Sequence, residues 1–473
     1  MKWLKRIGVA LAVVVLLFLV VVGPWPVYKD SKFAQASYYK EALASIDKNA
    51  ALSDITDTPG TLRAGWGVRD MTPPIGTPMG GYGARPDGKR SKGVRDRLHA
   101  KAIVLADGKD TVAIIGSDML ITTPNIAELT WKKVKLAGLP LTENNILFTA
   151  SHTHCGPGGF GPGLAAKVSA GTYDPKVPEL ISTAYAEAIK EAYESMKPAK
   201  IAWGGVDAPE LIRNRTRDAA VDSMINYLVV DKESGERCYV MRFSAHPTNY
   251  GSDMMDFTAE YPGEFMKSVQ EQTGATAMYL GGSLGSSSPR APEGPSPNER
   301  IILLGQALAK KLLENTQALE FHDKVDVASL GTPVGMPGMQ MRPLSPKWRI
   351  SPVFARFFGV PTEGWIQGVR IGDVVFVGYP YDFSGEVGKA WREEYEAKGI
   401  HLWPTSFCVT YCGYLSPDRH YNTVEKNGQL DYETGLMSWF GPNAEAYFKA
   451  LTDRVVAGVT GGGAARVAAA PAN

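Results

Sequence analysis

The sequence predicts a mixed α/β fold (α+β), with central mixed β-sheets flanked by helices, behind a single N-terminal transmembrane helix. Strand-like runs alternate with amphipathic, helix-like segments along most of the 473 residues, as in sheets covered by helices. Hydrophobic residues make up 44% and charged residues 21% of the chain, which is the balance of a globular protein. One N-terminal apolar run is long enough to cross a bilayer, and the sequence holds no second one.

Residues 1–27 predict a signal anchor. Lys2, Lys5 and Arg6 precede the apolar run IGVALAVVVLLFLVVVG. The run ends in GPWP, a poor signal-peptidase site, so an uncleaved anchor is favoured over a cleaved signal peptide and secretion. Because a basic flank stays in the cytoplasm, the rest of the chain is expected on the extracytoplasmic side, periplasmic or at the cell surface.

Three regions are predicted behind this anchor. Residues 28–64 are polar with a partly helical pattern, and are expected to form a stalk. Residues 65–459, from GWGVRD to the helical pattern NAEAYFKALTDRVVAGV, are expected to form one folded body. Residues 460–473 are rich in glycine and alanine without an apolar period, and are expected to be disordered.

Strands and helices alternate through the predicted body. KAIVLADG and DTVAIIGSDML predict a hairpin, after which Pro124 starts a helix. NNILFTASHTH predicts a buried strand, and Pro178 starts a helix that runs to about Met196. Strands are predicted next at SMINYLVVD and RCYVMRFSAHPT, and later at DVVFVGYP and TSFCVTYCGYL. Three more amphipathic helices are predicted at PGEFMKSVQEQTG, ERIILLGQALAKKLLEN and SGEVGKAWREEYEAKG.

Charge, span number and cysteine content exclude several classes of function. The net charge is +1 and no long basic stripe appears, which argues against a nucleic-acid binder. A single span excludes a channel or transporter. Four cysteines in a chain of this length are no disulfide framework, and most are expected to be buried thiols. No protein partner is predicted.

Three of the seven histidines stand at the ends of predicted strands. His152 and His154 lie in TASHTHCGPGG, and His246 lies in YVMRFSAHPTNYG. The two-residue period of a strand places His152 and His154 on one face, and paired imidazoles at a strand end can bind zinc. The alternative, two polar residues at a strand end without a metal, stays open for the pair alone. The third histidine at a strand end favours the metal.

An anionic ligand is also expected, and residue type leaves three candidates: Asp382, Glu386 and Glu264. Tyr414 ends another strand and can ligate a cation or donate to an oxyanion, although a buried, hydrogen-bonded hydroxyl is the commoner role. The segment IRNRTR supplies guanidinium groups that either bind an oxyanion or stay solvated. GGSLG has the spacing of a nucleophile elbow, but no helix follows it directly.

Taken together, these motifs resemble the neutral (alkaline, non-lysosomal) ceramidase family, specifically its N-terminal catalytic domain. TASHTHCGPGGF is similar to the family's H-T-H-S-G-P-G-G, with Cys155 in place of the serine. NRT, GSSSPR and YPYDF are similar to its N-R-S, G-D-V-S-P-N and V-P-G-E-F. YCGYLSPDRHY and FGPNAEAY are similar to its Y-x-x-Y…E-E-Y and terminal segments. The resemblance follows the family's order over residues 65–459, which would then be the catalytic domain.

The resemblance implies a zinc-dependent amidohydrolase that cleaves the N-acyl amide bond of ceramide, or of a related N-acyl lipid, to sphingoid base and fatty acid. It implies four zinc ligands: His152, His246, Asp382 and Tyr414. It implies three groups that contact the reacting carbonyl or oxyanion: His154, Arg215 and Tyr432. It also places Ser288 on the family's active-site serine, either as nucleophile or as the group that holds the substrate's primary hydroxyl.

The sequence departs from the family pattern in ways that concern the substrate more than the metal. Ser286 and Arg290 replace the aspartate and asparagine of the serine motif, and an insertion precedes Tyr432. No room is expected after the last helix for the family's C-terminal β-sandwich. The alternatives are a zinc amidase or esterase acting on another acylated substrate, and a non-catalytic lipid-binding relative. The segment Gly335–Gly359 mixes Met, Trp, Phe, Lys and Arg, and is expected to form part of a lipid-facing rim or a substrate-entry loop, with a core-packing loop as the alternative.

Overall fold

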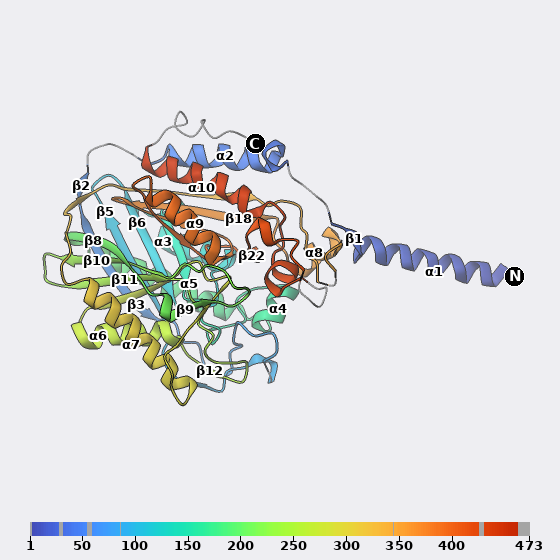
Figure 1. Ribbon diagram of the computed structural model, residues 1–473, viewed down its shortest axis with the longest axis horizontal. Coiled ribbons are helices and arrows are strands. Elements are labelled where there is room, and N and C mark those ends of the chain that lie inside the picture. Colours follow the sequence, from blue (N-terminus) through green and yellow to red (C-terminus); the bar gives the residue numbers. More distant parts are fainter. Residues whose placement is uncertain are drawn as a thin grey trace.

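Two β-sheets fill the centre of the folded body in the computed structural model, which describes residues 2–27, 32–53, 59–85, 87–343, 345–424 and 430–461 (Figure 1). The larger sheet has eight strands in the order β13 (Thr276–Gly281), β11 (Arg237–Phe243), β10 (Met224–Lys232), β8 (Lys197–Asp207), β3 (Arg63–Asp70), β5 (His99–Ala106), β6 (Thr111–Ser117) and β7 (Ile146–Ala150). The smaller sheet has four, in the order β16 (Val327–Gly335), β18 (Glu363–Ile371), β19 (Val374–Gly378) and β21 (His401–Thr405).

Both sheets are mixed, as predicted. The pairs β11–β13, β6–β7 and β19–β21 are parallel, and the other pairs within these sheets are antiparallel. The hairpin predicted between KAIVLADG and DTVAIIGSDML is the pair β5–β6. The two sheets contact each other through β6 and β7 on one side and β16, β18 and β19 on the other.

Helices cover the outer faces of the sheets (Figure 1). On the larger sheet, α5 packs on β3 and β5 and against α3, while α6 packs on β13 and against α7. On the smaller sheet, α2 packs on β16, α10 on β18 and α9 on β21. The bounds of these helices are α2 (Ser37–Ala50), α3 (Pro124–Leu136), α5 (Lys176–Glu194), α6 (Glu260–Thr273), α7 (Pro297–Asn315), α9 (Gly385–Glu396) and α10 (Ala444–Thr460).

The four-layer arrangement explains why some predicted strands are apolar without alternation. In β19, Val374 and Phe376 face the core between the two sheets. Val375 and Val377 face the second core, beneath α9 and α10. A strand buried on both faces needs apolar residues at every position, and all five residues of β19 are buried.

The expected stalk forms part of the folded body instead. Within residues 28–64, α2 buries Ala42 and Ile46, and Asn49 Nδ2 donates to Gly331 O at 2.7 Å. The helix offers only a narrow apolar stripe between polar residues, so its mean composition is polar although one face is covered. The strand β2 (Gly60–Thr61) also pairs with β15 (Lys324–Val325), ahead of the expected start at Gly65. The parts of this region at 28–31 and 54–58 lie outside the described residues.

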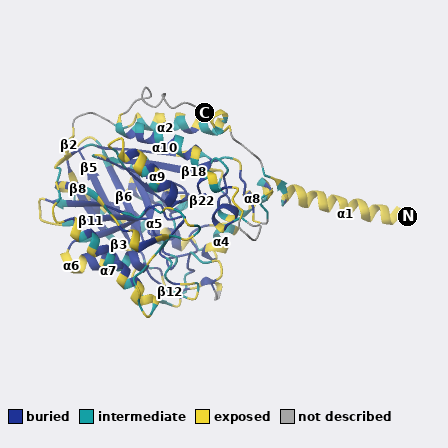
Figure 2. Cartoon of the chain, in the orientation of Figure 1, coloured by how far each residue is buried: buried dark blue, intermediate teal, exposed yellow. Residues whose placement is uncertain are grey.

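The two ends of the chain differ in what the structure shows. Helix α1 (Lys2–Val21) projects from the body with no buried residue, and it is the one helix of the described chain that is long and apolar enough to span a membrane (Figure 2). At the other end α10 closes the described chain, and the expected tail from residue 462 lies outside the described residues. All four cysteines are free and buried, as expected for most of them.

Candidate metal centre

The strand-end histidines meet where the two sheets meet. His152 and His154 follow the carboxyl end of β7, and His246 follows that of β11, so all three come from the larger sheet. Asp382 follows β19 of the smaller sheet and begins β20 (Asp382–Phe383). The carboxyl ends of these strands therefore bring distant parts of the sequence to one place. Binding sites are commonly found at such strand ends.

Asp382 and Tyr414 are fixed side by side by strand register. β20 pairs in parallel with β22 (Tyr414–Leu415), and Asp382 lies directly opposite Tyr414. Opposite residues of a pair project to the same face, so the carboxylate and the phenol point into the same space. Both side chains are buried.

The ligand atoms converge. Asp382 Oδ2 lies 3.2 Å from His246 Nε2 and 3.7 Å from His152 Nε2. One ring nitrogen from each of His152, His154 and His246 lies within 4.8 Å of the others. His152 and His246 are buried, and His154 is half-buried.

Main-chain carbonyls fix the orientation of two of these imidazoles. Nδ1 of His152 lies 2.6 Å from Leu120 O, and Nδ1 of His246 lies 2.7 Å from Leu284 O. A carbonyl only accepts, so each Nδ1 carries the proton and donates it, which leaves Nε2 unprotonated and able to accept or to ligate. This second hydrogen bond is the usual support of a metal-binding histidine.

Backbone strain and an aromatic stack also hold His152. Its φ of +66° is a left-handed conformation, which costs a residue with a side chain about 1–3 kcal/mol and tends to occur at functional sites. Its ring stacks on that of Phe407 with 4.1 Å between the ring centroids. His154 is held differently, with its ring 4.8 Å from that of Tyr82 and neither ring nitrogen hydrogen-bonded within the described residues.

The charges of the cluster suit a cation. Burial lowers the pKa of His152 to about 3 and lowers those of His154 and His246, so all three imidazoles are neutral. Burial favours a protonated Asp382, but the neighbouring His246, His152 and Arg215 outweigh it and lower its pKa to about 2. Neither carboxylate oxygen of Asp382 receives a hydrogen bond from the described residues. Lone pairs and an unpaired carboxylate that face one another in a buried space fit a metal ion between them.

Arg215 is the positive charge beside this cluster. Its Nη2 donates to His246 Nε2 at 3.1 Å, to Tyr414 Oη at 2.9 Å and to Gly285 O at 3.0 Å, so a metal ion bound to His246 would replace the first of these hydrogen bonds. Burial next to Asp382 raises the pKa of Tyr414 well above its usual value, so its hydroxyl is neutral. The rings of Tyr432 and Tyr414 meet edge to face, with 6.1 Å between their centroids. Arg215 and Tyr432 are both exposed, so the site opens to solvent on their side.

Ser288 lies at the edge of this arrangement. It belongs to β14 (Ser287–Pro289), which pairs with β9 (Ile212–Asn214), and its Oγ accepts a hydrogen bond from Arg213 Nε at 3.2 Å. The preceding residue has the closer link to the cluster, because Ser287 O lies 3.1 Å from Nδ1 of His246.

Of the three candidate carboxylates, Asp382 is the one that lies among the histidines. Glu386 binds Arg217 at 2.7 Å, and Glu264 binds Arg95 at 2.8 Å. Both are engaged in ion pairs outside the cluster. The geometry therefore selects Asp382 among three carboxylates that residue type alone could not distinguish.

Comparisons with known proteins point in one direction. Residues 62–234 match the family model described as neutral/alkaline non-lysosomal ceramidase, N-terminal. The neutral ceramidase of Mycobacterium tuberculosis is 25% identical over 300 residues, which are 58% of this chain and 47% of that protein. Neutral ceramidase A of Dictyostelium discoideum is 29% identical over 161 residues, which are 33% of this chain and 22% of that protein. The chain thus spans about half the length, or less, of these curated relatives.

A solved structure extends the likeness of fold beyond the matched sequence. The crystal structure of neutral ceramidase from Pseudomonas aeruginosa superposes with a TM-score of 0.72 at 21% sequence identity. The superposition covers 85% of this chain and 75% of that one. The fold is therefore shared across both sheets.

Proposed function

Because the chain belongs to the neutral/alkaline, non-lysosomal ceramidase family, we propose that it is a zinc-dependent amidohydrolase of N-acyl lipids. Its substrate is ceramide or a related N-acyl lipid, cleaved at the amide bond to a sphingoid base and a fatty acid. The observation that carries the proposal is the convergence of two Nε2 lone pairs on the unpaired carboxylate of Asp382. Metal-dependent hydrolysis needs this kind of donor set beside an open mouth.

The residue types favour zinc. Two imidazoles, one carboxylate and one phenol oxygen are ligands that zinc accepts in a four-coordinate site. The residues that would hold it are His152, His246, Asp382 and Tyr414. When bound, zinc polarises a carbonyl and lowers the pKa of water to about 7.

Groups beside the metal ligands suit the stabilisation of a developing oxyanion. Arg215 brings a fixed positive charge to Tyr414 and His246, and a pre-placed charge needs no reorganisation as the substrate oxygen becomes negative. His154 has two ring nitrogens without a protein partner among the described residues, so it is available to a substrate oxygen or nitrogen. Tyr432 stands at the mouth, where its hydroxyl can reach the same oxygen.

For Ser288 the surroundings favour substrate binding over nucleophilic attack. The described neighbour that hydrogen-bonds its Oγ is Arg213, a guanidinium, which cannot take up a proton. A serine nucleophile needs a base against its hydroxyl. Ser288 with Arg213 is therefore assigned to hold the substrate's primary hydroxyl.

Metal analysis and hydrolysis together test the proposed function. We expect the full chain, purified in detergent, to contain about one zinc per chain and to release fatty acid from N-acyl sphingosines. His152→Ala should lose both zinc and activity, whereas His401→Ala, at a half-buried position where His401 pairs with Glu396, should retain both.

The outcomes separate the alternatives. Zinc with hydrolysis of simple esters or other amides, but not of N-acyl sphingosines, would indicate an amidase or esterase for another acylated substrate. A second such function is favoured by Ser286 and Arg290, where the serine segment departs from the family pattern. Protein without stoichiometric zinc would contradict both hydrolase assignments and leave a non-catalytic lipid-binding relative.

A further inference from the structure

The end of the apolar helix α1 is joined to the body by hydrogen bonds. β1 (Trp25–Pro26) pairs in antiparallel fashion with β17 (Trp348–Arg349). The hydroxyl of Ser351 donates to Val21 O at 2.6 Å, and the N–H of Ser351 donates to Val22 O at 2.9 Å. The end of α1 is therefore fixed against Ser351, the residue that precedes helix α8.

Two short helices beside this joint expose large apolar side chains. α8 (Pro352–Phe358) contacts α4 (Leu164–Ala170). Phe357 is 75% exposed and Val353 50% exposed on α8, and Val168 is 51% exposed on α4. Both helices lie on the side of the body from which α1 departs (Figure 1). Grouped, exposed apolar side chains on one side of a protein mark an interaction surface.

Two segments on this side carry charge of one sign. Residues 156–173 and 335–359 contain no aspartate or glutamate. They carry the exposed cations Lys167, Lys347 and Arg356, none of which forms an ion pair within the described chain. Basic residues next to exposed apolar ones are typical of surfaces that meet anionic lipid headgroups.

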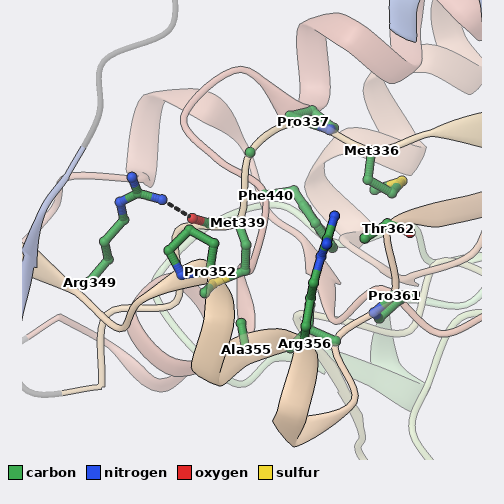
Figure 3. A pocket seen from close by; sticks show the side chains of 12 residues that line it. Met336, Pro337, Met339, Arg349, Pro352, Ala355, Arg356, Pro361, Thr362 and Phe440 are labelled. Atoms are coloured by element: carbon green, nitrogen blue, oxygen red, sulfur yellow. Dashed lines mark hydrogen bonds between the residues drawn. The ribbon is translucent and has the colours of Figure 1, made fainter. Parts of the chain in front are cut away.

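The same side is hollowed by a pocket of about 460 Å³ (Figure 3). Met336, Met339 and Phe440 give it an apolar lining, and Arg349 of β17 and Arg356 of α8 add two cations. The Nη1 of Arg349 donates to Met339 O at 2.7 Å, which ties the pocket wall to the strand that pairs with β1. An apolar hollow with cationic residues has the amphipathic character of a lipid.

We propose that this docking face, defined by Leu164, Val168, Trp348, Val353 and Phe357, rests in the headgroup region of the bilayer that holds α1. The end of the apolar run sets the level. The run begins at Ile7, after the basic flank, and ends at Val22, just before Gly23 and Pro24, so Val21 lies at the extracytoplasmic end of the span, where acyl chains give way to headgroups. The hydrogen bond from Ser351 to Val21 places the start of α8 at that same level. Trp348, 47% exposed, supplies the aromatic residue favoured there.

The docking face is linked by hydrogen bonds to the short helix that carries Tyr432. The segment between β16 and β17 hydrogen-bonds to the chain around the short helix Tyr432–Met437, through Gln340 N to Trp439 O at 2.6 Å and Arg342 N to Gly435 O at 3.2 Å. That helix carries Tyr432 at the mouth. A substrate that leaves the bilayer at the docking face would therefore meet the candidate site on the same side of the body.

Site-directed labelling of the full chain tests the proposal without relying on catalysis. All four native cysteines are buried, so an introduced cysteine is the accessible thiol of the described chain. Phe357→Cys, Val353→Cys and Val168→Cys would each carry an environment-sensitive fluorophore in nanodiscs of phosphatidylcholine and phosphatidylglycerol. Spin-labelled lipid added to the discs quenches fluorophores that lie within the headgroup region.

The matched control is Leu136→Cys, because Leu136 is 77% exposed at the end of α3 that precedes β7, at the opposite end of that strand from His152. We expect lipid quenching at positions 357, 353 and 168 at least about twofold stronger than at position 136, since interfacial segments sit about 5–10 Å into the boundary. Equal quenching at all four positions would overturn the proposal. An intact mass that shows the loss of α1 would also overturn it. The same holds if quenching increases with the number of protein copies per disc and not with the amount of labelled lipid, because that result would indicate contact between copies of the chain.

Discussion

At the scale of single residues, two main-chain carbonyls decide how the candidate centre works. Leu120 O and Leu284 O each accept a hydrogen bond from the Nδ1 of a histidine, so that the opposite nitrogens meet at Asp382. The site uses only the main-chain carbonyls of these two leucines and not their side chains. Their positions depend on how the loops after β6 and β13 are held, which makes the residues that hold those loops part of the site's support.

Asp118 holds the first of these loops and predicts a pH dependence of stability. Asp118 lies two residues before Leu120, and its Oδ2 accepts a hydrogen bond from His99 N at 2.8 Å. Complete burial raises its pKa from 3.8 to about 7, so the folded state binds a proton that the unfolded state releases. Its stabilising contribution is therefore full below about pH 4 and is lost as the pH rises through about 7.

Asp118→Asn should keep the hydrogen bond to His99 and remove this titration. We expect the melting temperature of the natural chain to fall between pH 5 and pH 8, and that of the variant to fall less over the same range. Thermal melts at four pH values measure the difference. Parallel curves for the two proteins would show that Asp118 does not titrate in this range.

At the scale of elements, a buried ion pair stabilises the carboxyl end of strand β11, a few residues before His246. Arg242 and Asp222 are completely buried and lie 2.9 Å apart, and Arg242 also donates to Asn226 Oδ1 and to Pro404 O. These bonds tie β11 to β10 and to the smaller sheet.

Arg242→Met should destabilise the fold by about 3–5 kcal/mol, because it leaves the buried Asp222 carboxylate with Arg392 alone and removes the donor to Asn226 Oδ1 and Pro404 O. Arg237→Met on the same strand is the matched control, since Arg237 pairs with Asp231 at the half-exposed end of the sheet and should cost no more than about 1 kcal/mol. Urea unfolding in detergent, followed by circular dichroism, compares the two. Equal losses would mean that burial of the pair does not matter to β11.

Local pattern predicted some elements well and others not at all. β7 and β19 could be read because strands buried on both faces are apolar throughout, and α3 because Pro124 starts it. The docking of α2 and the pairing of β1 with β17 could not be predicted. Both are contacts between segments about 300 residues apart, and such contacts produce no periodic pattern in the local sequence. The stacking of Phe407 on His152 could not be predicted for the same reason, because nothing in the local sequence distinguishes this phenylalanine from other aromatic residues in loops.

At the scale of the whole molecule, the candidate centre lies across the contact between the two sheets. His152 and His246 follow strands of the larger sheet, and Asp382 follows a strand of the smaller one. A metal held by all three would cross-link the two halves of the core. The motifs could be placed at strand ends from sequence, but their meeting depends on sheet-on-sheet packing, which sequence pattern does not specify.

Metal removal should therefore lower global stability. At free zinc a hundredfold above its dissociation constant, binding contributes about 2.7 kcal/mol, and a chelator such as phenanthroline should remove it. We expect the melting temperature of the natural chain to drop with chelator, while His152→Ala melts low with or without it. Hydrogen exchange should rise in the loops after β7 and β19. An unchanged melting temperature would contradict a structural role for the metal.

The joint between α1 and the body has a kinetic consequence. A chain tethered through a slack linker would tumble above the membrane and capture substrate from any direction, but a strand pair and the bonds from Ser351 leave little freedom of rotation about the tether. If α1 spans the bilayer that contains a lipid substrate, the helix confines the search to two dimensions, and the joint adds a fixed orientation of the body toward the leaflet. The quantity that governs turnover is then the mole fraction of substrate in the leaflet, and dilution of the vesicles in buffer leaves the rate per enzyme unchanged.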